Sequence, residues 1–143
     1  MLIVGLIGIV IVALGAWALL AWPILNVVET GLTPEYADLR PQRYPVTKAC
    51  VFDAAMHAVS RLPRWQLVEY REDAGEIRAE VRTRLWRFVD DVSIRVTAEN
   101  AQTFVSVKSA SRVGRGDFGQ NARNIRTFFG ELDGRLGAAA DCH

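Results

Sequence analysis

The chain opens with an apolar stretch as long as a membrane span. Residues 1–28 (MLIVGLIGIVIVALGAWALLAWPILNVV) contain no charged side chain. About 20 apolar helical residues cross a hydrocarbon core roughly 30 Å thick, so the stretch predicts an uncleaved transmembrane helix even if Pro23 ends or kinks it. A cleaved signal peptide is the alternative. It is disfavoured because no Lys or Arg precedes the apolar run and the bulky Trp17 occupies the middle of the best small-x-small site.

Small residues share one stripe of this predicted helix, namely Gly8, Gly15 and Ala18. In lipid, close packing drives helix association, and small residues let a second helix approach. The stripe therefore predicts a helix-packing face for an integral membrane partner. The alternative is that Gly and Ala are simply common in membrane helices.

The pattern changes after the apolar stretch. Residues 29–45 (ETGLTPEYADLRPQRYP) hold three prolines and few large apolar residues, and they predict an extended linker. Residues 46–143 read as one folded domain of ordinary size. Its first helix begins after the N-cap Thr47 and ends near Leu62, before Pro63, with apolar residues at i, i+3, i+4 and i+7 (Phe52, Ala55, Met56 and Val59).

Strand-like alternation fills the middle of this domain. The alternating segments are 65–71, 76–83, 92–96 and 103–107, and short turns join them. An amphipathic helix over 117–136 follows the last of them. A fifth short strand is possible at 44–46. The predicted fold is α+β: one N-terminal transmembrane helix, then an antiparallel sheet of four to five strands with two helices packed on one face.

Charge and cysteine content exclude some functions. Seventeen basic and sixteen acidic residues give a net charge of +1, so no nucleic-acid partner is expected. The two cysteines and two histidines show no metal-ligand spacing, and no metal site or cofactor is predicted. If the two helices pack antiparallel, Cys50 and Cys142 meet and predict a disulfide, which favours a periplasmic domain. The few basic residues after the span lean towards a cytoplasmic domain, so the orientation stays open.

Two polar segments are candidates for chemistry. Residues 114–119 match G-x-G-x-x-G, but no second parallel strand follows, so a flexible turn is favoured over a dinucleotide site. A weaker reading is an anion held at the helix N-terminus near Arg112, Arg115 and Arg123, which Asp117 would oppose. Asp90-Asp91 could act as an acid–base or metal pair. A turn that pairs with arginines is favoured, because no His, Cys or third carboxylate joins them.

These segments carry a family resemblance. Residues 87–96, together with the S-x-S-R-x-G-x-x-D-x-G-x-N run over 109–121, resemble the bacterial domain-of-unknown-function family numbered 1499, and the likeness extends over residues 36–136. The resemblance implies an envelope-associated bacterial domain with no assigned reaction. The matched residues imply one polar corner, either structural or anion-binding, built from Asp90, Asp91, Arg112, Arg115, Asp117 and Asn121.

The functional expectation combines these observations. Neither a Ser-His-Asp nor a Cys-His arrangement is visible, so the protein is not expected to be an enzyme. The favoured function is a non-catalytic accessory or assembly subunit of a larger bacterial membrane complex, of respiratory or photosynthetic type. Its expected location is the inner membrane, with a single pass. The alternative is a membrane-tethered module that binds a small anionic ligand.

Overall fold

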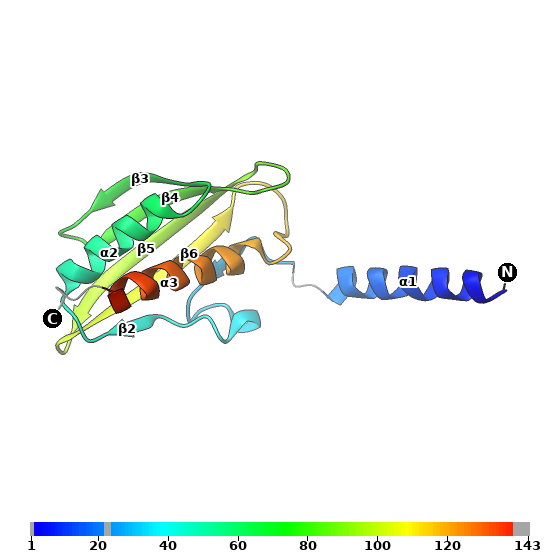
Figure 1. Cartoon of the computed structure of the whole chain (residues 1–143), viewed down its shortest axis with the longest axis horizontal. Helices are drawn as coiled ribbons and strands as arrows, with labels where there is room; N and C mark the ends of the chain where they lie inside the picture. The colour runs from blue at the N-terminus through cyan, green and yellow to red at the C-terminus, as the bar shows by residue number, and fades with distance from the viewer. Residues whose placement is uncertain (1, 22–23, 139–143) are drawn as a thin grey trace.

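The computed structural model describes residues 2–21 and 24–138 (Figure 1). The elements, in chain order, are α1 (Leu2–Ala21), β1 (Val27–Glu29), the 3-10 helix η1 (Pro34–Tyr36), β2 (Gln42–Tyr44), α2 (Lys48–Arg61), β3 (Trp65–Arg71), β4 (Glu76–Arg82), β5 (Val89–Glu99), β6 (Gln102–Ser111) and α3 (Gln120–Ala138).

The sheet has six strands, and every pairing is antiparallel. Its order is β1-β6-β5-β4-β3, and β2 pairs with β6 on the same edge as β1. In register, Val27 faces Ala110 near one end of β6 and Tyr44 faces Thr103 near the other. Both short strands therefore cover the edge of β6 that β5 leaves open.

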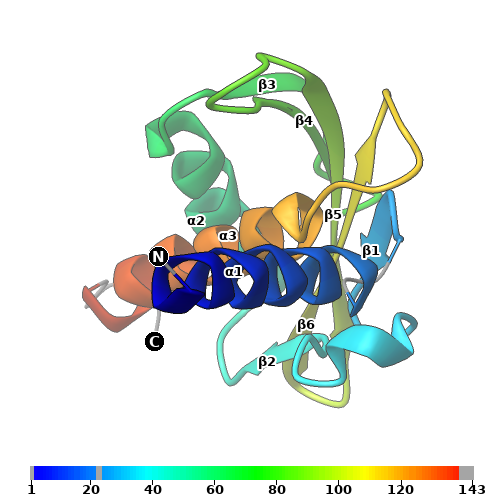
Figure 2. The same ribbon diagram turned by 90° about the vertical axis from the view of Figure 1, so that its right-hand side faces the viewer.

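One face of the sheet carries the core. Side chains alternate along the strands, so Ile77, Ala79 and Val81 of β4 point inward and are buried. Figure 2 shows α2 and α3 on the same side of the sheet. They cover this face with side chains that include Val51, Val59, Ile125, Phe128 and Leu132. Full burial of a Val, Leu, Ile or Phe side chain stabilises a fold by about 1.5–3 kcal/mol, so this apolar layer holds the domain together.

The N-terminal part of the prediction needs correction. Within residues 2–21 and 24–138, no helix is long and apolar enough to cross a membrane. A span requires about 20 apolar residues. By this finding the transmembrane helix predicted over 1–28 is wrong. The expected single-pass inner-membrane location, the periplasmic side and the contacts with lipid and integral membrane proteins required that span, and they are corrected with it.

The packing face predicted on this helix has no neighbour in the described part of the chain. A Cβ placed on Gly8 or Gly15 would meet no atom of another segment within 4 Å. The side chain of Ala18 lies outside the described residues. The role of this stripe stays a prediction.

The strand count also differs from the prediction of four or five. Residues 29–45 were expected to form an extended linker, but they follow directly on β1 and contain η1 and β2. Thr30 and Leu39 of this segment are buried against the domain. The short strand expected at 44–46 is β2, which lies two residues earlier, whereas β1, also three residues long, is too short for an alternating pattern to reveal it. They form because the open edge of β6 offers unpaired backbone groups.

Candidate functional site

The first part of the predicted polar corner lies inside the domain. Asp90 of β5 points to the helix side of the sheet and is 1% exposed. The Nδ2 group of Asn124 donates to Asp90 Oδ2 at 2.9 Å and to Ser109 Oγ at 3.2 Å. The Ser109 hydroxyl donates to Asn121 Oδ1 at 2.6 Å, and Asn121 Nδ2 donates to Ser111 Oγ at 2.9 Å. We call Asp90, Ser109, Ser111, Asn121 and Asn124 the buried polar cluster.

This cluster joins β5, β6 and α3 to the segment before β1. Asn121 Nδ2 also donates to the backbone carbonyl of Asn26 at 3.0 Å, so α3 holds the chain just before β1. Burial raises the pKa of Asp90, and hydrogen bonds from Ser111 and Asn124 oppose that rise. The nearby carboxylates of Asp117 and Asp91 raise this pKa further. Every member of the cluster has a hydrogen-bond partner, which indicates a structural role.

Asp117 caps the start of α3. Its Oδ1 accepts from the backbone N–H of Gly119 at 2.9 Å, and its Oδ2 accepts from the backbone N–H of Asn121 at 2.5 Å. Gly119 adopts φ +76°, a left-handed conformation that favours glycine. In the D-x-G-x-N part of the motif, Asp117 therefore caps the helix, Gly119 allows the chain to turn, and Asn121 places its amide in the core. The backbone donors proposed to hold an anion are already occupied by this carboxylate.

The second part of the predicted corner lies on the opposite face of the sheet. Arg112 donates from Nε to Asp91 Oδ2 at 2.8 Å and from Nη2 to Asp91 Oδ1 at 2.6 Å. The same Nη2 donates to Glu80 Oε1 at 2.5 Å. The hydrogen bonds that Arg112 donates to these two carboxylates raise its pKa, and Asp91 contributes more than Glu80. In the described residues, no ion pair or hydrogen bond reaches the Arg115 side chain. The six predicted residues are therefore divided: Asp90 and Asn121 belong to the buried polar cluster, Asp117 caps α3, Asp91 pairs with Arg112 on the open face, and Arg115 stands apart.

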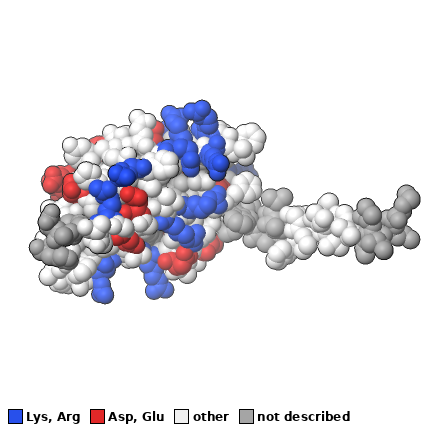
Figure 3. Space-filling model, in the orientation of Figure 1, with Lys and Arg blue, Asp and Glu red and all other residues white. Residues whose placement is uncertain are grey.

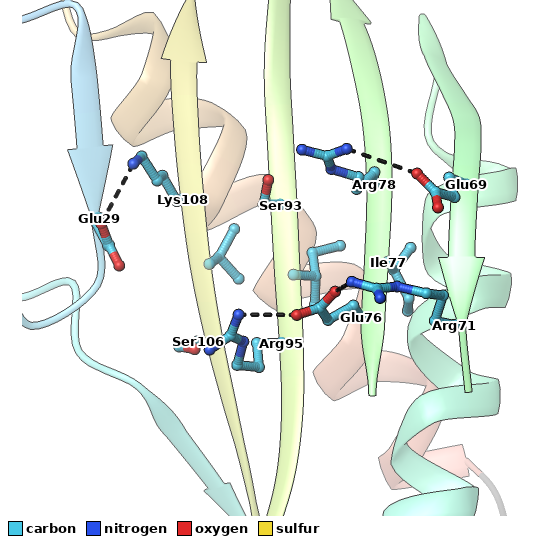
Figure 4. A pocket seen from close by; sticks show the side chains of 12 residues that line it. Glu29, Glu69, Arg71, Glu76, Ile77, Arg78, Ser93, Arg95, Ser106 and Lys108 are labelled. Carbon is cyan, nitrogen blue, oxygen red and sulfur yellow. Dashed lines mark hydrogen bonds and ion pairs between the residues drawn. The ribbon is translucent and has the colours of Figure 1, made fainter. Parts of the chain in front are cut away.

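The open face of the sheet holds a pocket of about 550 Å³ (Figure 4). Glu76 lies between Arg71 and Arg95, and Arg95 Nη2 donates to Glu76 Oε1 at 2.9 Å. The hydrogen bond from Arg71, more than any other interaction, lowers the pKa of Glu76. Arg78 lies 3.6 Å from Glu69 on the neighbouring strand. Each of these cations is paired with a carboxylate. We therefore interpret the pocket as a shallow part of the solvated sheet face and not as a site for a charged ligand.

A different surface stands out at the end of the sheet where β4 meets β5. The β4–β5 connection, residues 83–88, exposes Leu85 (79%), Trp86 (71%) and Phe88. The β6–α3 connection, residues 112–119, exposes Val113 and Phe118. The two connections are neighbours, because the backbone N–H of Arg112 donates to the carbonyl of Val89 at 3.2 Å.

Ile24 joins the same surface from the segment before β1. Its Cγ2 atom lies 3.6 Å from the position of a Cβ built on Gly116. The backbone N–H of Asp117 donates to the carbonyl of Leu25 at 3.0 Å, which fixes this segment against the second connection. We call the exposed apolar set the loop platform; its members are Ile24, Leu85, Trp86, Phe88, Val113 and Phe118.

The backbone presents the platform in a defined shape. The N–H of Thr83 donates to the carbonyl of Phe88 at 2.8 Å and closes the first connection. Arg123 Nη1 donates to the carbonyl of Phe118 at 3.0 Å in the second. Arg87 (φ +54°) and Phe118 (φ +50°) are both left-handed, although neither is a glycine. Such conformations cost about 1–3 kcal/mol each and concentrate at functional sites.

Sequence reasoning missed this surface. It gave Leu85 and Trp86 no role, and Phe88 entered only as part of the 87–96 run that carries the family resemblance. A usable signal was present, because residues 83–88 connect two strands without Gly, Asn or Pro and carry three large apolar side chains. Turns are normally polar, and apolar residues in them are errors unless they serve a function.

The predicted disulfide falls partly outside the described residues. Cys50 lies in the first turn of α2, where its backbone N–H donates to Thr47 Oγ1 at 3.3 Å. It is not a free thiol. Cys142 lies outside the described residues, so the pairing of the two cysteines stays a prediction.

Comparisons with known proteins place the chain in a family. The family described as "Protein of unknown function (DUF1499)" matches residues 23–132. No curated protein matches the chain. Among solved structures, TTHA0849 from Thermus thermophilus is 11% identical, covers 80% of this chain and 99% of its own, and has a TM-score of 0.43. Ara h 8.0201 is 10% identical, with coverage of 79% and 98% and a TM-score of 0.39.

Proposed function

The chain belongs to the DUF1499 family, whose function is unknown, and we propose that it acts as a non-catalytic accessory module that binds another protein through the loop platform. The family match covers both connections that form this surface, residues 83–88 and 112–119. The module supplies a binding surface to a larger protein assembly.

The observation that carries this proposal is the exposure of large apolar side chains on two connections that leave the same end of the sheet. Isolated exposed apolar residues are ordinary, whereas a contiguous group marks an interaction site. Burying one such side chain is worth about 1.5–3 kcal/mol, so covering Leu85, Trp86 and Phe118 together would supply a large part of a micromolar affinity. Trp is also among the residues most enriched at the energetic centres of protein interfaces.

The chemistry of the described residues supports a non-catalytic role. Catalytic acids and bases need a group free to exchange a proton with a bound molecule. Asp90 is sealed in the buried polar cluster, while Arg112 and Glu76 are held by partners on the open face. The loop platform itself carries no carboxylate, thiol or imidazole.

Site-specific photo-crosslinking in the native cells tests the proposal. The photoreactive residue p-benzoylphenylalanine replaces Trp86 in one variant and Phe118 in another. Tyr70 is the matched control position: it is an exposed aromatic residue (55%) that pairs with Ile77, at the far end of β4 from the platform. We expect the same protein to be captured from positions 86 and 118 and not from position 70. Capture of no protein from the platform, or equal capture from Tyr70, would refute the proposed function.

A further inference from the structure

We infer that the segment bound by the loop platform is acidic, with carboxylates placed beside large apolar side chains. This inference rests on the proposed function, because it concerns the same surface. It is carried by three arginines in and beside the two connections, none of which has an ion-pair partner within the described residues.

Three arginines border the apolar side chains. Arg84 and Arg87 stand on either side of Leu85-Trp86, and Arg115 follows Val113 by two residues in the second connection. None of the three has a carboxylate within ion-pair distance among residues 2–21 and 24–138. Figure 3 shows Lys and Arg gathered over the end of the domain nearest α1.

The acidic residues near these arginines are already engaged. Asp91 is held by two hydrogen bonds from Arg112, which also binds Glu80. Asp117 accepts two backbone hydrogen bonds at the start of α3. On the open face of the sheet, by contrast, Arg71 faces a glutamate in the same pocket. These carboxylates keep their negative charge, and the excess positive charge at the platform comes from Arg84, Arg87 and Arg115, which have no ion-pair partner in the described part of the chain.

This charge selects the chemistry of the occupant. A guanidinium presents a planar set of donors that matches a carboxylate in a bidentate pair. The apolar side chains between the arginines exclude water when covered, and a charge pair beside them is then worth more than in bulk water. A basic or neutral occupant would leave three arginines beside a dry interface without partners, which is costly. An acidic segment of another protein, with apolar side chains for the platform, satisfies both requirements.

The test uses the full chain with p-benzoylphenylalanine at position 118, and it identifies the captured segment by mass spectrometry. We expect a segment in which Asp and Glu outnumber Lys and Arg. Arg84→Glu should reduce capture by about tenfold or more, because it sets like charges against each other. Exchanging an acidic residue of the captured segment for Arg should restore capture to the Arg84→Glu chain.

Arg43→Glu is the matched control. It makes the same change of net charge at an exposed position on β2, away from the platform, and should leave capture unchanged. A neutral or basic captured segment, equal effects of the two charge reversals, or adducts with lipid instead of protein would overturn the inference. Capture of a protein through a neutral or basic segment would leave the proposed function standing. Capture of no protein at all would overturn both.

Discussion

Replacing Asn121 by Ala should strongly destabilise the domain, although the change removes no large apolar side chain from the core. Its side chain is fully buried. The amide accepts from the Ser109 hydroxyl at 2.6 Å and donates to Ser111 Oγ at 2.9 Å and to the Asn26 carbonyl at 3.0 Å. Asn121→Ala removes all three hydrogen bonds at once.

The expected loss follows from these contacts. A hydrogen bond contributes about 1 kcal/mol net to folding, so the three bonds together contribute about 3 kcal/mol. The Ser109 hydroxyl would lose the acceptor of its proton in the core, which adds about 1 kcal/mol or more, whereas the Asn26 carbonyl would still accept from the backbone N–H of Ser111 at 2.8 Å. We expect the free energy of unfolding to fall by about 3–5 kcal/mol, a large share of the roughly 5–15 kcal/mol typical of a native protein.

Urea unfolding of the full chain, followed by circular dichroism, measures this change through the midpoint and slope of the transition. Thr127→Ala is the matched control: it removes a polar side chain at an exposed position of α3 and should shift the free energy by less than about 0.5 kcal/mol. Asn124→Ala shares the partner Ser109 with Asn121→Ala, so the double variant should lose less than the sum of the two. A midpoint for Asn121→Ala equal to that of Thr127→Ala would refute the reasoning.

Three further outcomes are expected. Burial raises the folded-state pKa of Asp90 above the ordinary value of 3.8. The carboxyl group therefore contributes its full stabilisation at pH values below 3.8, and this stabilisation is lost as the pH rises through the folded-state pKa. Asp90→Asn cannot titrate, so the stability of the native chain relative to this variant should fall with rising pH across that window; a constant difference in a pH series of urea midpoints would contradict this. Gly75→Ala should lower the free energy of unfolding by more than about 2 kcal/mol in the same assay, because Gly75 has φ +69° and the new Cβ would lie 2.1 Å from a backbone carbonyl oxygen. Its control, Gly137→Ala, adds a Cβ in open space on α3 and should raise the free energy of unfolding by about 0.5–1 kcal/mol. Alkylation of the unreduced, denatured chain should label neither Cys50 nor Cys142, and two labelled thiols would exclude the disulfide.

The regular elements of the domain could be predicted because their burial pattern is local. Alternation along 76–83 identifies β4, and the 3.6-residue period from Phe52 to Val59 identifies α2. The first turn expected for the last helix, beginning at Asp117, is instead its cap, and α3 begins at Gln120. Strands β1 and β2 depend on β6, which lies far along the chain, so the local pattern gave only an approximate position for β2 and did not predict β1.

The candidate site could be predicted by residue type but not by placement. The sequence predicts Asp90 and Asp91 in a turn, where both side chains could reach the same arginine. They lie instead at consecutive positions of β5, so their side chains point to opposite faces of the sheet. That alternation separates the buried polar cluster from the Arg112 pairs. The loop platform depends on where two connections project, and only the three-dimensional arrangement brings them together.

The position of β6 also determines the order in which the domain can form. Strands β1 and β2 are the first two strands of the described sheet along the chain, yet their partner is residues 103–110 of β6, the last of its strands. During synthesis β1 and β2 cannot pair until β6 has been made, and until then their backbone groups are hydrogen-bonded to water. Pairing across such sequence separation is slow, because the entropy of closing a long loop is lost before the contacts form. The completed β1–β6–β2 edge is therefore expected to be a late step of folding, and the open edge of β6 is the surface most exposed to pairing with another chain until it closes.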